Sequence, residues 1–382
     1  MIPIIEKYVK GIIMLKKFSV TNFKNFKDTT IFDLSSPANY EFNTEVIHNN
    51  CVSKAIIYGI NGSGKSNLAL AIFDIVLHLT DKQKLIDRYY PYLNMDSNKE
   101  LAEFEYCFNF LENEVIYRYG KKDPVSLVYE KVLINGKEVL SYDFSQNRGY
   151  TNLSGAENLQ LSSTLNTETN KLSRVKYVNN NSLLKDNSEN RAFIAFTSFV
   201  DNMLMFYSLM ENRYQGFTVG IDNYTQGIIR ENKVKEFEEF LKEEEINYQL
   251  IVSDFNGTPE LFCKFKNGNI PFLSIASTGT RSLALFYYWY LKMNKASLVF
   301  IDEYDAFYHF ELSQELIKLV KKITNTQIIV STHNTDLITN DILRPDAYFI
   351  IKNNQIKSFD KLTEKELRRA HNLQKMYKAG AF

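Results

Sequence analysis

The sequence predicts an α/β fold, with a mixed β lobe, a parallel βαβ core and an inserted, largely helical middle region. The first observation is a glycine-rich loop between the apolar run at 55–58 and an amphipathic helical pattern. The second is the pair of apolar runs "SLVFIDE" and "TQIIVSTH", which flank the helical pattern "ELSQELIKLVKKI". Continuous apolar strands on both sides of a helix are typical of parallel strands covered on both faces.

Residues 14–135 are expected to form the first lobe. The runs "LKKFSV" and "TTIFDL" predict an opening hairpin, because β-rich residues stand on both sides of a short polar turn. After the glycine loop and its helix, three further strands are expected at 102–110, 114–120 and 125–134. The lobe should therefore combine a sheet with the helix that follows the loop.

Residues 136–269 are expected to be an insertion, since their first part is rich in Ser, Asn and Thr. Two helical patterns follow, "RAFIAFTSFVDNMLMFYSLM" and the acidic "ENKVKEFEEFLKEEE". The first is apolar almost all round, which favours a buried core helix over a docking surface at Ala192 to Met210. Residues 270–382 should form the second lobe, which contains the parallel core.

Composition restricts the functional classes. The chain has 382 residues, of which 45% are apolar. Its 45 Lys and Arg residues balance 45 Asp and Glu residues, which argues against a surface that is basic throughout. A local basic patch for nucleic acid is still compatible with this balance. Cys51, Cys107 and Cys263 are too widely spaced for a zinc site or disulfide framework and are expected to be reduced. No apolar run approaches membrane-spanning length, so we expect a cytoplasmic protein without a membrane partner.

The stretch "GINGSGKS" fits the phosphate-binding pattern G-x-x-x-x-G-K-[ST] between a strand and a helix. Glycines let backbone N–H groups approach phosphates, and the helix N-terminus adds positive potential. Lys65 is expected to reach the β- and γ-phosphates, and Ser66 to hold Mg²⁺. The residues expected around the nucleotide are Asn61, Gly62, Ser63, Gly64, Lys65, Ser66 and Asn67.

Three further side chains follow the two core strands. Asp302 is expected to bind Mg²⁺ through water, and Glu303 to orient or deprotonate the attacking water. His333 ends the next strand along the chain, where parallel sheets gather their ligands, and is expected to sense the γ-phosphate.

A second anion site is expected at Ser277, Thr278 and Gly279, which precede a long apolar helix. One nucleotide has no use for two such sites in one chain, but it would use both if two chains enclosed it. An ordinary helix cap is the alternative.

Together, "GINGSGKS", "STGTRS", "LVFIDE" and "STHN" resemble the nucleotide-binding domain of ABC ATPases, and more closely their SMC/RecF/OLD branch. Asn61 is typical of that branch, and "IDEYDAFYH" is similar to its dimer-contacting loop, with Asp305 and His309. The resemblance implies that Ser277 and Gly279 bind the γ-phosphate on an opposite protomer. The glutamine that couples metal to the helical region in most ABC proteins has no obvious counterpart, and the Ser-Thr-Gly signature is degenerate.

By this resemblance, we expect an ATPase that uses ATP and Mg²⁺, forms a homodimer around ATP and serves as sensor or scaffold for a separate toxin or nuclease in anti-phage defence. Residues 334–382 offer no second acidic cluster for a nuclease of their own. The alternative is a DNA-repair or chromosome-maintenance ATPase that acts on DNA. A GTPase is disfavoured because "NKAS" lacks the base-reading aspartate, and a transporter subunit because such proteins rarely contain so long an insertion.

Overall fold

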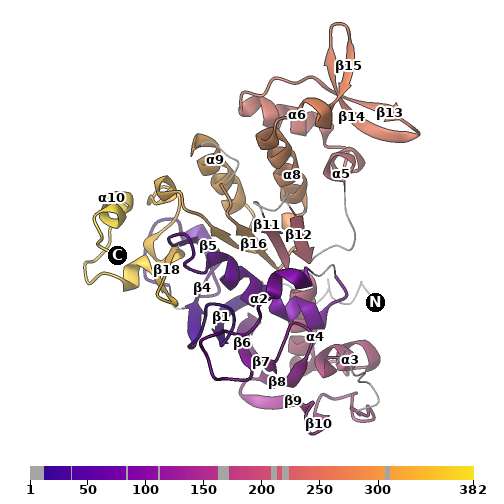
Figure 1. Ribbon diagram of the computed structural model, residues 1–382, viewed down its shortest axis with the longest axis vertical. Coiled ribbons are helices and arrows are strands. Elements are labelled where there is room, and N and C mark those ends of the chain that lie inside the picture. Colours follow the sequence, from indigo (N-terminus) through magenta and orange to yellow (C-terminus); the bar gives the residue numbers. More distant parts are fainter. Residues whose placement is uncertain are drawn as a thin grey trace.

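The computed structural model describes residues 13–35, 37–82, 85–110, 112–161, 172–207, 213–216, 223–305 and 310–382. Two seven-stranded sheets organise them, with α2 (Lys65–Leu79) between the sheets. Figure 1 shows α8 and α9 above the parallel sheet, and α2 with the antiparallel sheet below it. No helix within these ranges is long and apolar enough to cross a bilayer.

The antiparallel sheet has the strand order β10-β9-β8-β7-β6-β1-β2. Its strands are β1 (Met14–Thr21), β2 (Thr30–Asp33), β6 (Ala102–Phe110), β7 (Asn113–Lys121), β8 (Leu127–Ile134), β9 (Lys137–Asp143) and β10 (Arg148–Thr151). The predicted hairpin and the three later strands of the first lobe are confirmed. β9 and β10 extend this sheet beyond residue 135.

The second sheet has the order β12-β11-β16-β17-β5-β18-β19, and its five central strands are parallel. Its strands are β5 (Lys54–Tyr58), β11 (Leu204–Tyr207), β12 (Arg213–Gly216), β16 (Leu298–Asp302), β17 (Gln327–Ser331), β18 (Tyr348–Lys352) and β19 (Gln355–Ser358). Every residue of β5, β16 and β17 is buried, as continuous apolar runs require. The βαβ unit formed by β16, α9 (Phe310–Lys321) and β17 is confirmed.

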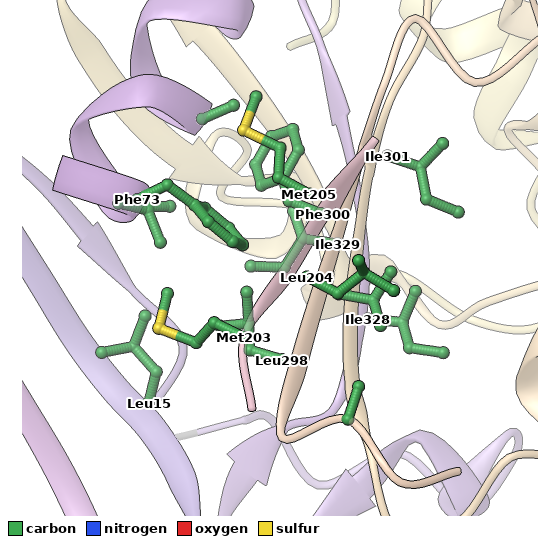
Figure 2. Close-up of a cluster of buried hydrophobic side chains, with 14 of the residues drawn as sticks. Leu15, Phe73, Met203, Leu204, Met205, Leu298, Phe300, Ile301, Ile328 and Ile329 are labelled. Atoms are coloured by element: carbon green, nitrogen blue, oxygen red, sulfur yellow. The ribbon is translucent and has the colours of Figure 1, made fainter. Parts of the chain in front are cut away.

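The main core lies where α2 meets the parallel sheet. In Figure 2, Phe73 of α2 packs toward Met205 and Phe300, and Leu15 of β1 lies at the same interface. All four side chains are at most 1% exposed. The antiparallel sheet packs on the other side of α2, where Tyr106 donates a hydrogen bond to the Ala71 carbonyl oxygen. Both sheets therefore hold the helix that follows the phosphate loop.

Among the described residues of the middle region, which also supplies β9 to β12, there are four helices and a separate three-stranded sheet. They are α3 (Arg174–Asn181), α4 (Ser188–Asp201), α5 (Tyr224–Arg230), α6 (Val234–Glu243), β13 (Leu250–Phe255), β14 (Thr258–Phe265) and β15 (Gly268–Pro271). α7 (Phe272–Ile275) and α8 (Thr278–Met293) lead from this sheet back to the core. The remaining short elements are β3 (Ile47–His48), β4 (Cys51–Val52), α10 (Leu373–Lys378), η1 (Thr44–Val46), η2 (Ile86–Tyr89), η4 (Thr335–Leu337), η5 (Pro345–Ala347) and η6 (Phe359–Lys361).

The single helix expected from Ala192 to Met210 is wrong. Its first part is α4, which ends at Asp201, and Leu204–Tyr207 form β11 beside β16. A run that is apolar on every side satisfies a buried strand as well as a buried helix, so periodicity cannot separate them. Residues 208–210 lie outside the described ranges. The aromatic side of α4 contacts Phe108 and Tyr117, which confirms the core interpretation.

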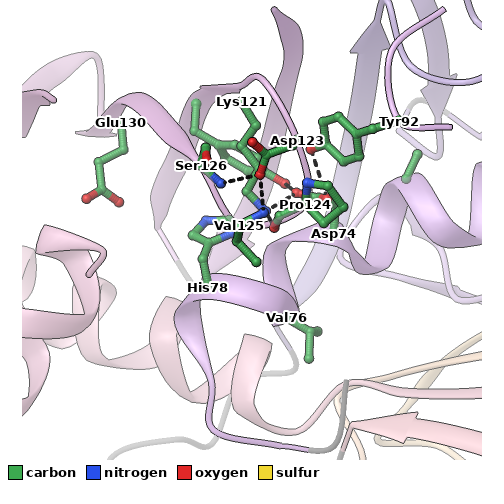
Figure 3. A network of polar contacts seen from close by, with 12 residues as sticks. Asp74, Val76, His78, Tyr92, Lys121, Asp123, Pro124, Val125, Ser126 and Glu130 are labelled. Carbon is green, nitrogen blue, oxygen red and sulfur yellow. Dashed lines mark hydrogen bonds and ion pairs between the residues drawn. The ribbon is translucent and has the colours of Figure 1, made fainter. Parts of the chain in front are cut away.

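A buried ion pair joins α2 to the antiparallel sheet (Figure 3). Asp74 accepts hydrogen bonds from Lys121 Nζ at 2.7 Å, from the Tyr119 hydroxyl at 2.9 Å and from the Tyr92 hydroxyl at 3.0 Å. Asp74 and Lys121 are both 0% exposed. Burial raises the pKa of Asp74 and lowers the pKa of Lys121, while their mutual attraction opposes both changes.

Replacement of Asp74 with Ala should lower the free energy of unfolding by about 3–5 kcal/mol, because Lys121 would remain buried without its counter-charge. Urea denaturation followed by circular dichroism measures this. The double variant Asp74→Leu, Lys121→Met should recover part of the loss. As a control, Glu315→Ala removes a partner from the exposed pair with Lys318 and should cost less than about 1 kcal/mol. Equal losses for Asp74→Ala and Glu315→Ala would contradict the assignment.

Candidate nucleotide-binding site

The loop between β5 and α2, called the cradle below, requires glycine at three positions. Gly62 and Gly64 have φ angles of 76° and 104°, a left-handed conformation that favours glycine. A Cβ atom on Gly59 would lie 2.3 Å from Ser63 Oγ and 2.9 Å from the Ile351 carbonyl oxygen. Ser63 Oγ is buried in the loop without a hydrogen-bond partner among the described residues. These features fit a loop built to surround a phosphate.

The side chains of Asn25, Asn67 and Asn354 form a hydrogen-bonded group beside the loop, called the asparagine brace below. Asn67 Nδ2 donates to Asn25 Oδ1 at 2.7 Å, and Asn25 Nδ2 donates to Asn354 Oδ1 at 2.9 Å. Asn354 Nδ2 in turn donates to the Asn25 carbonyl oxygen at 2.7 Å. Asn25 also packs so closely that a Cβ on Gly64 would lie 2.6 Å from its Nδ2 atom. The brace therefore joins the loop after β1, the start of α2 and the turn between β18 and β19.

Lys65 lies at the centre of the site. Its Nζ atom donates to the Gly59 carbonyl oxygen at 3.0 Å, lies 2.8 Å from His333 Nε2 and lies 3.8 Å from Glu303 Oε1. The residue is only 4% exposed, and this burial lowers the pKa of Lys65, while the charges of Glu303, Asp302 and Asp305 act in the opposite direction. The structure thus brings three of the predicted side chains into one cluster.

The carboxylates sit at the end of β16, where Ser331 of the neighbouring strand positions both of them. Ser331 Oγ donates to Asp302 Oδ1 at 2.8 Å and accepts from the Glu303 backbone N–H at 2.9 Å. Glu303 has a φ angle of 50°, so the chain turns sharply after β16. This turn sends its carboxylate toward His333, with 3.3 Å between Glu303 Oε1 and His333 Nε2. Asp302 is 5% exposed and the Glu303 side chain 18%.

The residues present fit a nucleotide with Mg²⁺. Ser66 is the second residue of α2 and is partly exposed beside the cradle, and Asp302 supplies a carboxylate at the end of β16. Hydroxyl and carboxylate oxygens are ligands that Mg²⁺ accepts together with substrate phosphates. Within the described residues, no group of three or more His, Cys, Asp or Glu side chains could hold a metal ion. Ser66 would supply an oxygen ligand directly, and Asp302 would hold the ion through a water molecule.

Ser277 and Gly279 lie outside this cluster. Ser277 caps α8: its Oγ accepts from the Thr280 backbone N–H at 3.1 Å and lies 2.9 Å from Thr280 Oγ1. No hydrogen bond or ion pair among the described residues joins Ser277 or Gly279 to Lys65 or the carboxylates. The helix cap given as the alternative is present, and the second anion site stays a prediction.

Sequence reasoning missed Asn25, Asn354 and Ser331. For Asn25, the sequence indicated only a turn within "TNFKNFKD". In the structure, Phe23 and Phe26 form an isolated β-bridge across this turn. Ser331 lies within "VSTH", but nothing in the sequence indicated that its hydroxyl would face the neighbouring strand. Two residues were expected in a dimer-contacting loop. Asp305 accepts a hydrogen bond from Thr332 Oγ1 at 2.5 Å, and His309 lies outside the described residues.

A family model matches this chain, and solved structures resemble it. The family model described as "AAA domain, putative AbiEii toxin, Type IV TA system" matches residues 54–339, which is most of the chain. Similar solved structures include an SMC head bound to the C-winged helix domain of ScpA and the SMC head domain from Thermotoga maritima. Their TM-scores are 0.46 and 0.42, and each is 16% identical to this chain. Each alignment covers 90% of this chain and 97% of the other chain. A search of curated proteins found no match.

The predicted α/β fold is confirmed: a mixed β lobe and a parallel core meet at the loop between β5 and α2. The family match covers the loop, both carboxylates and His333. The chain therefore belongs to the ATPase-domain family described as "AAA domain, putative AbiEii toxin, Type IV TA system".

Proposed function

We propose that the protein binds ATP with Mg²⁺ and hydrolyses it slowly to ADP and phosphate. The observation that supports this most directly is the cluster in which Lys65 Nζ lies 2.8 Å from His333 and 3.8 Å from Glu303. Lys65 neutralises charge on the β- and γ-phosphates, and the loop from Asn61 to Asn67 surrounds them. Bound Mg²⁺ would polarise the phosphate oxygens, and it would be held directly by Ser66 and through water by Asp302.

Glu303 and His333 have separate roles in this proposal. Glu303 orients and deprotonates the attacking water, since its carboxylate projects into the site from a turn that Ser331 fixes. His333 senses the γ-phosphate from the end of β17. In the present arrangement both contact Lys65, so the lysine has to exchange these contacts for phosphate oxygens when ATP enters. Binding would thereby release Glu303 and His333 for their roles.

We further propose that two chains enclose ATP, with Ser277 and Gly279 of one protomer facing the γ-phosphate on the other. The N-terminus of α8 supports this, because Ser277 caps it and Gly279 lies in its first turn. A helix N-terminus attracts anions, and a second copy would supply it from the opposite side.

The biological role that we propose is a cytoplasmic sensor or scaffold for a separate toxin or nuclease in anti-phage defence. ATP hydrolysis would act as the conformational switch that controls this effector. The family description, which names a toxin and a type IV toxin–antitoxin system, supports that context. The domain boundaries 14–135, 136–269 and 270–382 remain part of the proposal. A DNA-repair or chromosome-maintenance ATPase is the second candidate.

Replacement of Lys65 with Ala should slow ATP hydrolysis at least about a hundredfold, because the phosphates lose their buried cation. Phosphate release measured with Mg²⁺ and ATP provides the readout. Lys318→Ala, which removes an exposed lysine of α9, should hydrolyse ATP like the parent. If Lys65→Ala also matches the parent, the site is misassigned.

Glu303→Gln should bind ATP, fail to cleave it and accumulate as a dimer, because the amide cannot accept the proton of water. Light scattering with and without ATP measures the association. Adding Gly279→Glu to this variant should prevent dimerisation but not ATP binding, since a carboxylate in the first turn of α8 is compatible with the helix and repels phosphate. Glu303→Gln that stays monomeric with ATP would count against the enclosed nucleotide.

The purified chain should not cleave nucleic acid by itself if the effector is a separate protein. Incubation with ATP, Mg²⁺ or Mn²⁺, and plasmid, linear duplex or transfer RNA tests this on gels. Strong cleavage that disappears in Lys65→Ala would place the effector in this chain and overturn the two-component proposal.

A further inference from the structure

The C-terminal part of the chain concentrates positive charge. Residues 352–378, called the basic segment below, contain eight Lys or Arg and three Asp or Glu, a net charge of +5. The whole chain has a net charge of zero, so the remaining residues sum to −5. The segment comprises β19, η6 and α10, which lie together at one side of the molecule (Figure 1). Positive charge is therefore concentrated in this segment, while the rest of the chain has a net negative charge.

Most of these cations are exposed and unpaired. Arg368 pairs with Glu366, and Lys378 pairs with Asp336. The other six are exposed and form no ion pair with the described residues: Lys352, Lys357, Lys361, Lys365, Arg369 and Lys375. Their charges are available to a ligand.

The fold holds this segment in a fixed position. Asn340 is 4% exposed, and its Nδ2 atom lies 3.1 Å from each of the carbonyl oxygens of Arg368, Arg369 and His371. Leu373 of α10 is 0% exposed. Fixed cations lose less conformational entropy on binding than cations on a loose tail.

The chemistry of the surface favours nucleic acid. None of the exposed large apolar side chains in the described structure lies between residues 352 and 378. Protein interfaces depend on buried aromatic or aliphatic anchors, and membrane-surface segments insert apolar side chains, so both partners are disfavoured. Binding to a phosphate backbone needs only cations in suitable positions. We propose that the basic segment binds the phosphate backbone of a nucleic acid duplex.

The same segment is connected at two points to residues that lie next to the candidate nucleotide site. Asn354 belongs to the brace behind the phosphate loop, and Lys352 and Lys357 stand on either side of it in the sequence. Gln374 hydrogen-bonds Asp336, which follows His333 by three residues. A duplex on this surface should therefore change the rate of ATP hydrolysis. This consequence, unlike the binding itself, rests on the proposed function.

Fluorescence anisotropy with labelled DNA and RNA duplexes of about 30 base pairs, without ATP, tests the binding. Contact of six cations with phosphates predicts a log–log salt slope of about −5, or about a thousandfold weaker binding at roughly 200 mM than at roughly 50 mM salt. The triple variant Lys361→Glu, Arg369→Glu, Lys375→Glu should weaken binding at least about thirtyfold. Tighter binding of either duplex type supports the proposal.

The control variant Lys242→Glu, Lys264→Glu, Lys266→Glu changes the net charge by the same amount at exposed positions in α6 and around β14. It should retain the parent affinity, and equal losses in the two triple variants would overturn the assignment to this surface. Equal binding of poly-glutamate or anionic lipid vesicles would overturn the nucleic-acid specificity. Lys65→Ala should bind duplex like the parent, which separates failure of this proposal from failure of the ATPase proposal.

Discussion

The pairing of β5 with β17 is the constraint on which the site depends. The two strands are parallel, with Val330 opposite Ile56 and Ser331 opposite Ile57, and β16 pairs with the other side of β17. Parallel strands end at the same edge of a sheet, so the phosphate loop, the carboxylates and His333 meet although about 270 residues separate Lys65 from His333. A shift of β17 by one residue against both of its neighbours would turn its side chains to the opposite face and separate Ser331 from Asp302.

The position of the loop also depends on what holds α2. This helix contacts the parallel sheet through Phe73 and the antiparallel sheet through Asp74. A buried ion pair is expensive to desolvate and contributes little net stability compared with apolar packing, but it tolerates few alternative geometries. We interpret the Asp74–Lys121 pair as a device that fixes the orientation of α2. The asparagine brace at Asn25 then fixes the beginning of the same helix.

Much of the nucleotide site could be predicted from the sequence because it rests on local patterns. The glycine loop and the strand-end Asp302 and Glu303 lie within short segments whose spacing reflects backbone chemistry. β11 could not be predicted, since four apolar residues after a helix give no period. The asparagine brace could not be predicted either, because Asn25 and Asn354 are 329 residues apart in the sequence and only the fold brings them together. The charge of the C-terminal segment was visible in the sequence, but the role of Asn340 in holding it was not.

The left-handed turn at Glu303 links the pairing of the strands to the proposed chemistry of the site. A non-glycine residue in this conformation costs roughly 1–3 kcal/mol, so surrounding contacts have to maintain it. Two contacts come from one residue of the next strand: Ser331 Oγ accepts from the Glu303 N–H, and the Ser331 carbonyl oxygen accepts from the Tyr304 N–H at 2.9 Å. His333 follows Ser331 by two residues on the same chain segment. A movement of this strand end would therefore displace Glu303 and His333 together, so the group proposed to activate water and the group proposed to sense phosphate are mechanically linked.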